Sequence, residues 1–148
     1  MKTYSAKDLY PKGWGTGEDN LPWPGYTPII NALGEVVCRV EIPDCGGYHG
    51  DTQVLLYDKI TDKYGYFLLG WGSCSGCDAL LRCESYEEVD ELIESISQSI
   101  RWFDDENEAL RFFTEHDFTT DPSHSKAFVG FCREYFTEKG GVRCCSRP

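Results

Sequence analysis

The chain has 148 residues, of which 41% are hydrophobic, 26% charged and 14% aromatic. This length and composition fit one globular domain and exclude a disordered chain, because apolar and aromatic residues at this frequency bury enough surface to offset the entropy of ordering. The formal net charge of −11 argues against direct binding to nucleic acid or to an anionic membrane, both of which need a basic face, and predicts a basic partner.

The first 30 residues are rich in Pro and Gly, in the runs 10–15 and 21–26. These residues disfavour helices and central strands, so the sequence predicts an irregular leader over residues 1–30. Trp14 and Trp23 lie in this stretch and are expected to anchor it against the domain.

Three strand-like segments follow, at 35–42, 52–57 and 64–71. In the first, residues 36, 38, 40 and 42 are apolar while 35, 39 and 41 are charged, a period of two that is typical of a half-buried strand. The connections between the segments are too short for crossover helices, so the strands are expected to pair as an antiparallel meander.

Helices are predicted over 86–102, 105–115 and 123–138. Ser85 with Glu88 three residues later forms a capping box before the first, and Asp105 with Glu108 repeats the pattern before the second. The third is expected to start at Asp121-Pro122 and to stop near Gly140-Gly141, leaving a short basic tail over 140–148. The sequence therefore predicts a single α+β domain over 1–148, with a three-stranded or slightly larger antiparallel meander and about three helices on one face of the sheet.

No apolar run approaches the roughly 20 residues of a membrane-spanning helix, and residues 1–9 show no hydrophobic segment typical of a secretion signal. We therefore expect a cytoplasmic protein. In a reducing compartment, the eight cysteines are expected as free thiols, metal ligands or a redox pair rather than as a disulfide framework.

A C-x-x-C pair, Cys74 and Cys77, follows the third predicted strand. In a meander, the loop between the first two strands lies beside the exit of the third, which brings Cys45 and His49 near that pair. Four ligands of these types are typical of a structural zinc site. The alternatives are a redox-active dithiol and two Gly-rich loops with no site at all. Cys38 and Cys132 fall at core positions and are expected to be buried, inert thiols.

Acidic residues are concentrated between positions 84 and 117, where twelve acids and two bases carry −10 of the −11 charge. Glu87, Glu91 and Glu94 fall on one helical stripe opposite the apolar one. The charge continues in Asp104, Asp105, Glu106 and Glu108. We expect these seven residues to bind a basic surface of a host protein, with carboxylates spaced as phosphates are. The alternative is a solvated face that keeps the protein soluble.

One stretch of the chain resembles small acidic proteins of tailed phages. The residues that carry the resemblance are Gly50-Asp51-Thr52, the strand at 64–66, the run GWGSCSGCDAL at 70–80 and the helix start at 85–89. The resemblance covers roughly residues 50 to 115. It implies a viral setting, and no activity is associated with that group.

The sequence favours a binding protein over an enzyme. It contains three histidines, no phosphate-binding loop and no nucleophile elbow. We expect a phage-encoded inhibitor of a host nucleic-acid-handling or defence protein, similar in role to an anti-CRISPR protein. One alternative is a zinc or redox protein built on the cysteines, and a second is a structural or assembly protein of the virion.

Overall fold

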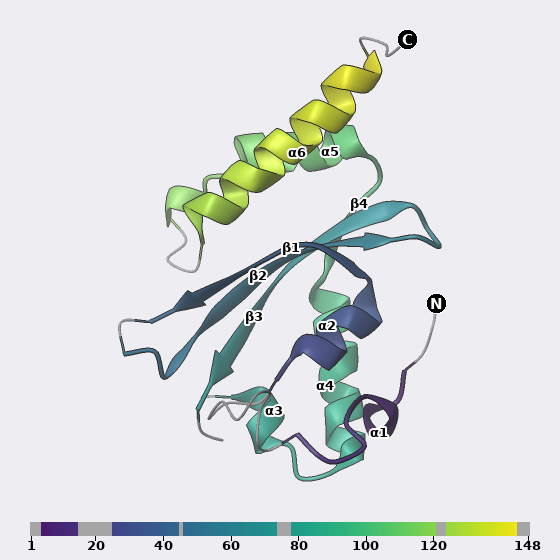
Figure 1. Ribbon diagram of the computed structural model, residues 1–148, viewed down its shortest axis with the longest axis vertical. Helices are drawn as coiled ribbons and strands as arrows, with labels where there is room; N and C mark the ends of the chain where they lie inside the picture. Colours follow the sequence, from purple (N-terminus) through teal and green to yellow (C-terminus); the bar gives the residue numbers. More distant parts are fainter. Residues whose placement is uncertain (1–3, 15–24, 45, 74–77, 121–123, 145–148) are drawn as a thin grey trace.

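The computed structural model describes residues 4–14, 25–44, 46–73, 78–120 and 124–144, the last five of these for their backbone only. Figure 1 shows a sheet between two layers of helices. The elements in chain order are α1 Ala6–Leu9, α2 Thr27–Leu33, β1 Glu35–Pro43, β2 His49–Asp58, β3 Lys63–Gly72, α3 Ala79–Arg82, α4 Tyr86–Ser99, β4 Arg101–Phe103, α5 Glu106–Glu115, a 3-10 turn Phe118–Thr120 and α6 Lys126–Cys144. None of the helices among these residues is long and apolar enough to cross a bilayer.

The four strands pair in the order β1-β2-β3-β4, and each neighbouring pair is antiparallel. The predicted α+β class and meander are thereby confirmed, and β1, β2 and β3 contain the three predicted strand ranges. The turn between β2 and β3 is held by Asp58, whose carboxylate accepts hydrogen bonds from Ile60 N at 3.0 Å and Thr61 Oγ1 at 2.9 Å. This turn forms one end of the cleft described below.

The fourth strand replaces the end of a predicted helix. Helix α4 stops at Ser99, and Ile100 already has extended dihedral angles. Trp102 lies opposite Gly65 of β3, and Phe103 lies opposite Tyr64. The prediction of helix through residue 102 was therefore wrong, because the apolar spacing continues past the point where the backbone gains partners in the sheet.

The predicted caps of α4 and α5 are confirmed. Ser85 Oγ accepts from Glu88 N at 3.2 Å, and Asp105 Oδ1 accepts from Glu108 N at 2.8 Å. Helix α6 starts later than predicted, and Ser125 Oγ accepts from Phe128 N at 3.2 Å as an N-cap does. Its backbone continues through Gly140-Gly141 to Cys144, so the predicted stop there was wrong.

Helices cover both faces of the sheet, so the prediction that they lie on one face was wrong. Val54 and Leu56 of β2 pack into one core with α1, α2 and α4. Leu55, between them, points to the opposite face and packs into a second core with α5 and α6. Because β2 is buried on both sides, it needs apolar side chains at successive positions rather than at alternate ones.

The described parts of the leader pack against the domain, Trp14 among them, but they are not wholly irregular; Trp23, the other predicted anchor, lies outside the described residues. The leader contains α1 and the start of α2, and Ala6, Tyr10 and Tyr26 are buried in the first core. Ala6 N donates to Asp90 Oδ1 of α4 at 2.6 Å. This contact fixes α1 beside the acidic helix.

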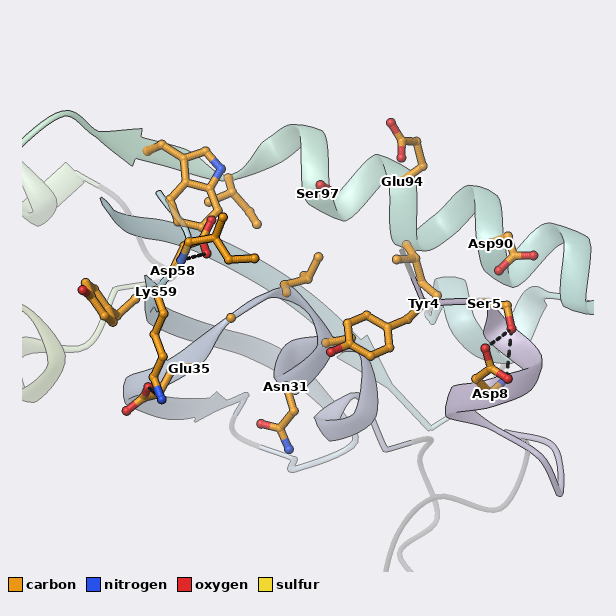
Figure 2. Close-up of a pocket in the computed structure, with 18 residues that line it drawn as sticks. Tyr4, Ser5, Asp8, Asn31, Glu35, Asp58, Lys59, Asp90, Glu94 and Ser97 are labelled. Carbon is orange, nitrogen blue, oxygen red and sulfur yellow. Dashed lines mark hydrogen bonds and ion pairs between the residues drawn. The ribbon is translucent and has the colours of Figure 1, made fainter. Parts of the chain in front are cut away.

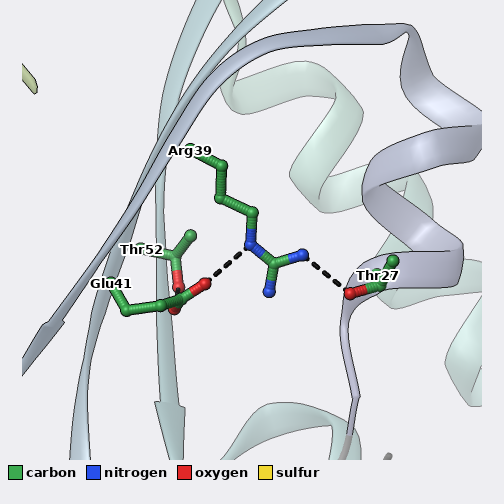
Figure 3. A network of polar contacts seen from close by, with 4 residues as sticks. All are labelled: Thr27, Arg39, Glu41 and Thr52. Carbon is green, nitrogen blue, oxygen red and sulfur yellow. Dashed lines mark hydrogen bonds and ion pairs between the residues drawn. The ribbon is translucent and has the colours of Figure 1, made fainter.

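A polar network attaches α2 to the edge of the sheet (Figure 3). Arg39 of β1 donates from Nη1 to Thr27 Oγ1 at 2.7 Å and from Nε to Glu41 Oε1 at 2.6 Å. The same Glu41 accepts a hydrogen bond from Thr52 of β2. The network holds the first residue of α2 on β1, and the other end of α2 forms part of the cleft.

Candidate functional site: the acidic side of helix α4

Helix α4 presents its acids on the side away from the core. Val89 and Ile96 are buried, whereas Glu87, Glu91 and Glu94 are exposed, which is the arrangement the 3.6-residue period predicts. None of the ion pairs between described residues includes an α4 carboxylate. The negative charge of this face is therefore not neutralised by neighbouring side chains.

The four acids that follow β4 have structural contacts of their own. Asp105 caps α5, and Glu108 Oε2 accepts from Asp104 N at 2.8 Å. Asp104 also lies 3.2 Å from Lys63 Nζ. These acids, with Glu106, begin a helix that packs in the second core, whereas α4 packs in the first. The structure thus divides the predicted acidic residues between two layers of the molecule (Figure 1).

A cleft of about 990 Å³ opens beside α4, and sequence reasoning did not predict it. Figure 2 shows Asp90, Glu94 and Ser97 along the helix, with Asp58, Lys59 and Glu35 placed across the cleft from it. Of the seven predicted acids only Glu94 lines the cleft. Its other charged side chains come from four separate elements or turns: Asp8, Glu35, Asp58, Lys59 and Asp90.

The charge of the cleft is strongly negative. Five carboxylates against one ammonium leave a formal charge of −4 on its walls. The ammonium of Lys59 lies 3.2 Å from Glu35, and both side chains are mostly exposed, so water screens this pair. Asp90 accepts from a backbone amide and remains on the surface. A cation that entered the cleft would meet carboxylates on opposite walls.

The rest of the cleft lining is largely apolar. Leu33, Ile93, Ile100 and Trp102 contribute to it, and each also packs against the first core. The ring of Tyr4 extends this surface (Figure 2). A volume of about 990 Å³ lies within the roughly 300–1,000 Å³ of ligand-binding clefts, and apolar walls are typical of them.

The sequence held one signal for the cleft. Asp90, Glu94 and Ser97 lie at i, i+4 and i+7 on α4, beside the stripe of Glu87 and Glu91, so a second polar stripe was visible. Asp8, Glu35 and Asp58 gave no signal, because only the folded chain brings them to this helix.

Three of the four predicted zinc ligands, Cys45, Cys74 and Cys77, lie outside the described residues. The fourth, His49, is exposed, and its Nε2 lies 2.9 Å from Asp44 Oδ2. His49 pairs with Gly72 in the register of β2 and β3, so the loops that carry the cysteines begin at the same end of the sheet. Across the described ranges no group of three or more His, Cys, Asp or Glu side chains is placed to hold a metal. The zinc site stays a prediction.

The other two cysteines singled out by the sequence are on the α6 side of the sheet. Cys132 of α6 is fully buried, and Cys38 of β1 packs against the same core. Burial raises the pKa of both thiols above the ordinary value for cysteine. Both are neutral thiols near pH 7; Cys132 is buried as predicted, whereas Cys38 is only partly buried.

A buried carboxylate supports the elements around the site. Asp78 is fully buried; its Oδ1 accepts from Tyr26 Oη at 2.7 Å and from Leu80 N at 2.8 Å, and its Oδ2 accepts from Gly72 N at 2.7 Å. These bonds join the residue before α2, the end of β3 and the start of α3. Each of these donors offsets part of the negative charge of Asp78, because a buried carboxylate needs hydrogen-bond partners.

No known protein family, curated protein or solved structure matched the chain.

Proposed function

We propose that this chain is a non-enzymatic binding protein that docks the acidic side of α4 on a basic surface of a partner protein. The observation that carries the proposal is the set of exposed carboxylates Glu87, Glu91 and Glu94, which have no ion-pair partner among the described residues. Glu87 and Glu91 are four residues apart, a spacing at which like charges cost a few tenths of a kcal/mol in helix stability. A basic partner would convert that cost into attraction.

The partner expected is a host protein that handles nucleic acid or acts in defence. Such proteins carry basic channels that attract phosphates, and a row of carboxylates on a rigid helix complements them in charge. The resemblance of residues 50 to 115 to small phage proteins supports a viral setting. On this proposal the chain acts as an inhibitor by occupying the channel.

Capture from host lysate tests the proposal when paired with a charge-matched control. The variant Glu87→Lys/Glu91→Lys/Glu94→Lys reverses the α4 face. The control Glu115→Lys/Glu134→Lys/Glu138→Lys changes the net charge equally with exposed residues of α5 and α6. We expect the wild type and the control to capture the same proteins at low salt and the α4 variant to capture none of them. High salt should release the captured proteins, because it screens the charges. Equal capture by both variants contradicts the proposal.

A further inference from the structure

The cleft beside α4 joins the acidic face to an apolar surface. Glu94 belongs both to the exposed stripe and to the cleft lining, so a partner that lies on α4 also reaches the cleft. Ile93, Ile100 and Trp102 also line it, and Ile60 of the β2–β3 turn, another lining residue, is 73% exposed. An occupant must therefore match negative charge and apolar surface at once.

We propose that this cleft receives a segment of the partner protein that carries an arginine flanked by apolar side chains; the inference rests on the proposed function and assigns the partner's chemistry. A guanidinium is planar, pairs with carboxylates in a fixed geometry and stacks on aromatic rings. The cleft offers both kinds of contact, with Asp90 and Glu94 on one wall and the side chains of Tyr4 and Trp102 in the lining. Lysine would pair with the carboxylates but gain less from the rings.

The size of the cleft favours a segment over a lone side chain. A volume of about 990 Å³ is at the upper end of what a single compact ligand fills. The walls come from helices and from a tight hairpin turn, so they are formed before the partner arrives. Apolar flanking residues would cover Leu33 and Ile93, which a free arginine would leave in water.

A defined peptide tests the assignment without knowledge of the natural partner. The probe is a fluorescein-labelled Leu-Arg-Trp-Arg peptide amide, and binding is read by anisotropy. The variant Ser97→Arg places a cation in the cleft from α4, whereas Ser95→Arg places the same cation on an exposed position of the same helix outside the cleft. Circular dichroism of both variants confirms that α4 is intact.

We expect Ser97→Arg to weaken peptide binding by about tenfold or more and Ser95→Arg by about twofold or less, because an added charge acts strongly only at short range in a partly enclosed site. A probe with both arginines replaced by neutral citrulline should not bind, and a probe with lysine in their place should bind more weakly than the arginine probe. Equal losses for the two serine variants, or a citrulline probe that binds as well as the arginine probe, overturns the proposal.

A second pair of variants is independent of how α4 tolerates substitution. Lys59→Gln removes the one cation that the described residues place in the cleft, and Lys63→Gln removes a cation on β3 that pairs with Asp104 outside it. Lys59→Gln should strengthen binding of the arginine probe about two- to threefold, and Lys63→Gln should not. Equal affinities for wild type and Lys59→Gln count against the cleft.

These results separate the cleft from the docking face. Peptide binding that survives Ser97→Arg overturns the cleft assignment and leaves the α4 face free to bind a partner. If Ser97→Arg abolishes peptide binding, the cleft assignment is supported. This holds even where the triple reversal of Glu87, Glu91 and Glu94 leaves lysate capture unchanged, a result that contradicts the proposed function alone.

Discussion

Asp78 shows how one buried residue supports the part of the fold that carries the site. Its carboxylate accepts from a phenol of the leader and from backbone amides at the end of β3 and the start of α3. Removing it would take this acceptor away from the Tyr26 hydroxyl and the Gly72 amide together, and would leave Leu80 N with its bond to Tyr26 alone. At the scale of single residues, the strongest stability effects are therefore expected here rather than among the surface acids.

We expect Asp78→Ala to lower the free energy of unfolding by about 2–4 kcal/mol, because several buried donors lose their acceptor together. The exposed cap variant Asp105→Ala is the control and should cost about 1 kcal/mol. Urea denaturation measures both. A smaller loss for Asp78→Ala than for Asp105→Ala would contradict the role assigned to the buried carboxylate.

Tyr26 gives this region a pH dependence. Burial, and then its hydrogen bond to Asp78, raises the pKa of the phenol far above its ordinary value. The neutral phenol therefore contributes stability that is fully present below the unfolded pKa of about 10 and is lost as the pH rises above it towards the folded value. Tyr26→Phe should flatten the fall in stability above about pH 10, whereas Tyr48→Phe at an exposed position should not. Parallel pH profiles for wild type and Tyr26→Phe would argue against this effect.

At the scale of elements, the junction between α4 and β4 depends on a glycine. A Cβ on Gly65 of β3 would lie 2.7 Å from Ile100 Cγ2 and 2.8 Å from Trp102 Cε3, whereas one on Gly70 would meet nothing closer than 3.6 Å. The missing side chain of Gly65 therefore leaves room for Ile100 and for the indole of Trp102.

Gly65→Ala is expected to lower the free energy of unfolding by about 1–3 kcal/mol, because the indole of Trp102 or strand β3 must move to admit the methyl group. Gly70→Ala on the same strand is the matched control and should stay within about 0.5 kcal/mol. Differential scanning fluorimetry compares the two. If both substitutions shift the melting temperature equally, the close packing of β4 on β3 does not restrict which side chain fits at position 65.

The three long strands and the helices α4, α5 and α6 were predictable from the sequence, because caps and apolar periods are local, whereas α1, α2 and β4 were not predicted. The capping boxes at Ser85 and Asp105 set the starts of α4 and α5. Their ends were harder to predict: Ile100 fits the apolar stripe of α4, yet the backbone there turns into β4 because pairing with β3 competes with the helix. The two-sided burial of β2 did have a local sign, the unbroken apolar run Val54-Leu55-Leu56, which a half-exposed strand would not need.

At the scale of the whole molecule, the sheet separates two sets of acids. Glu87, Glu91 and Glu94 lie on the layer of α1, α2 and α4, and the acids around Asp105 start the opposite layer. The cleft belongs to the first layer, and its walls combine α1, the end of α2, the β2–β3 turn and α4. Sequence reasoning found the acids of α4 but not the cleft, because the segments that form it are far apart along the chain and carry no common motif.

This division makes a prediction about where a partner docks. Contact through the layer of α4 should leave α5 and α6 exposed to solvent in the complex. The account therefore differs from one in which charge alone attracts a basic protein to any acidic part of the surface.

Amide hydrogen exchange, measured for the chain alone and for the chain saturated with a partner captured at low salt, shows whether a partner docks on the layer of α4. We expect slowed exchange over residues 86–99 and at the cleft residues 31–35, with residues 126–139 unchanged. Protection confined to 126–139, with 86–99 exchanging as in the free chain, would contradict this expectation.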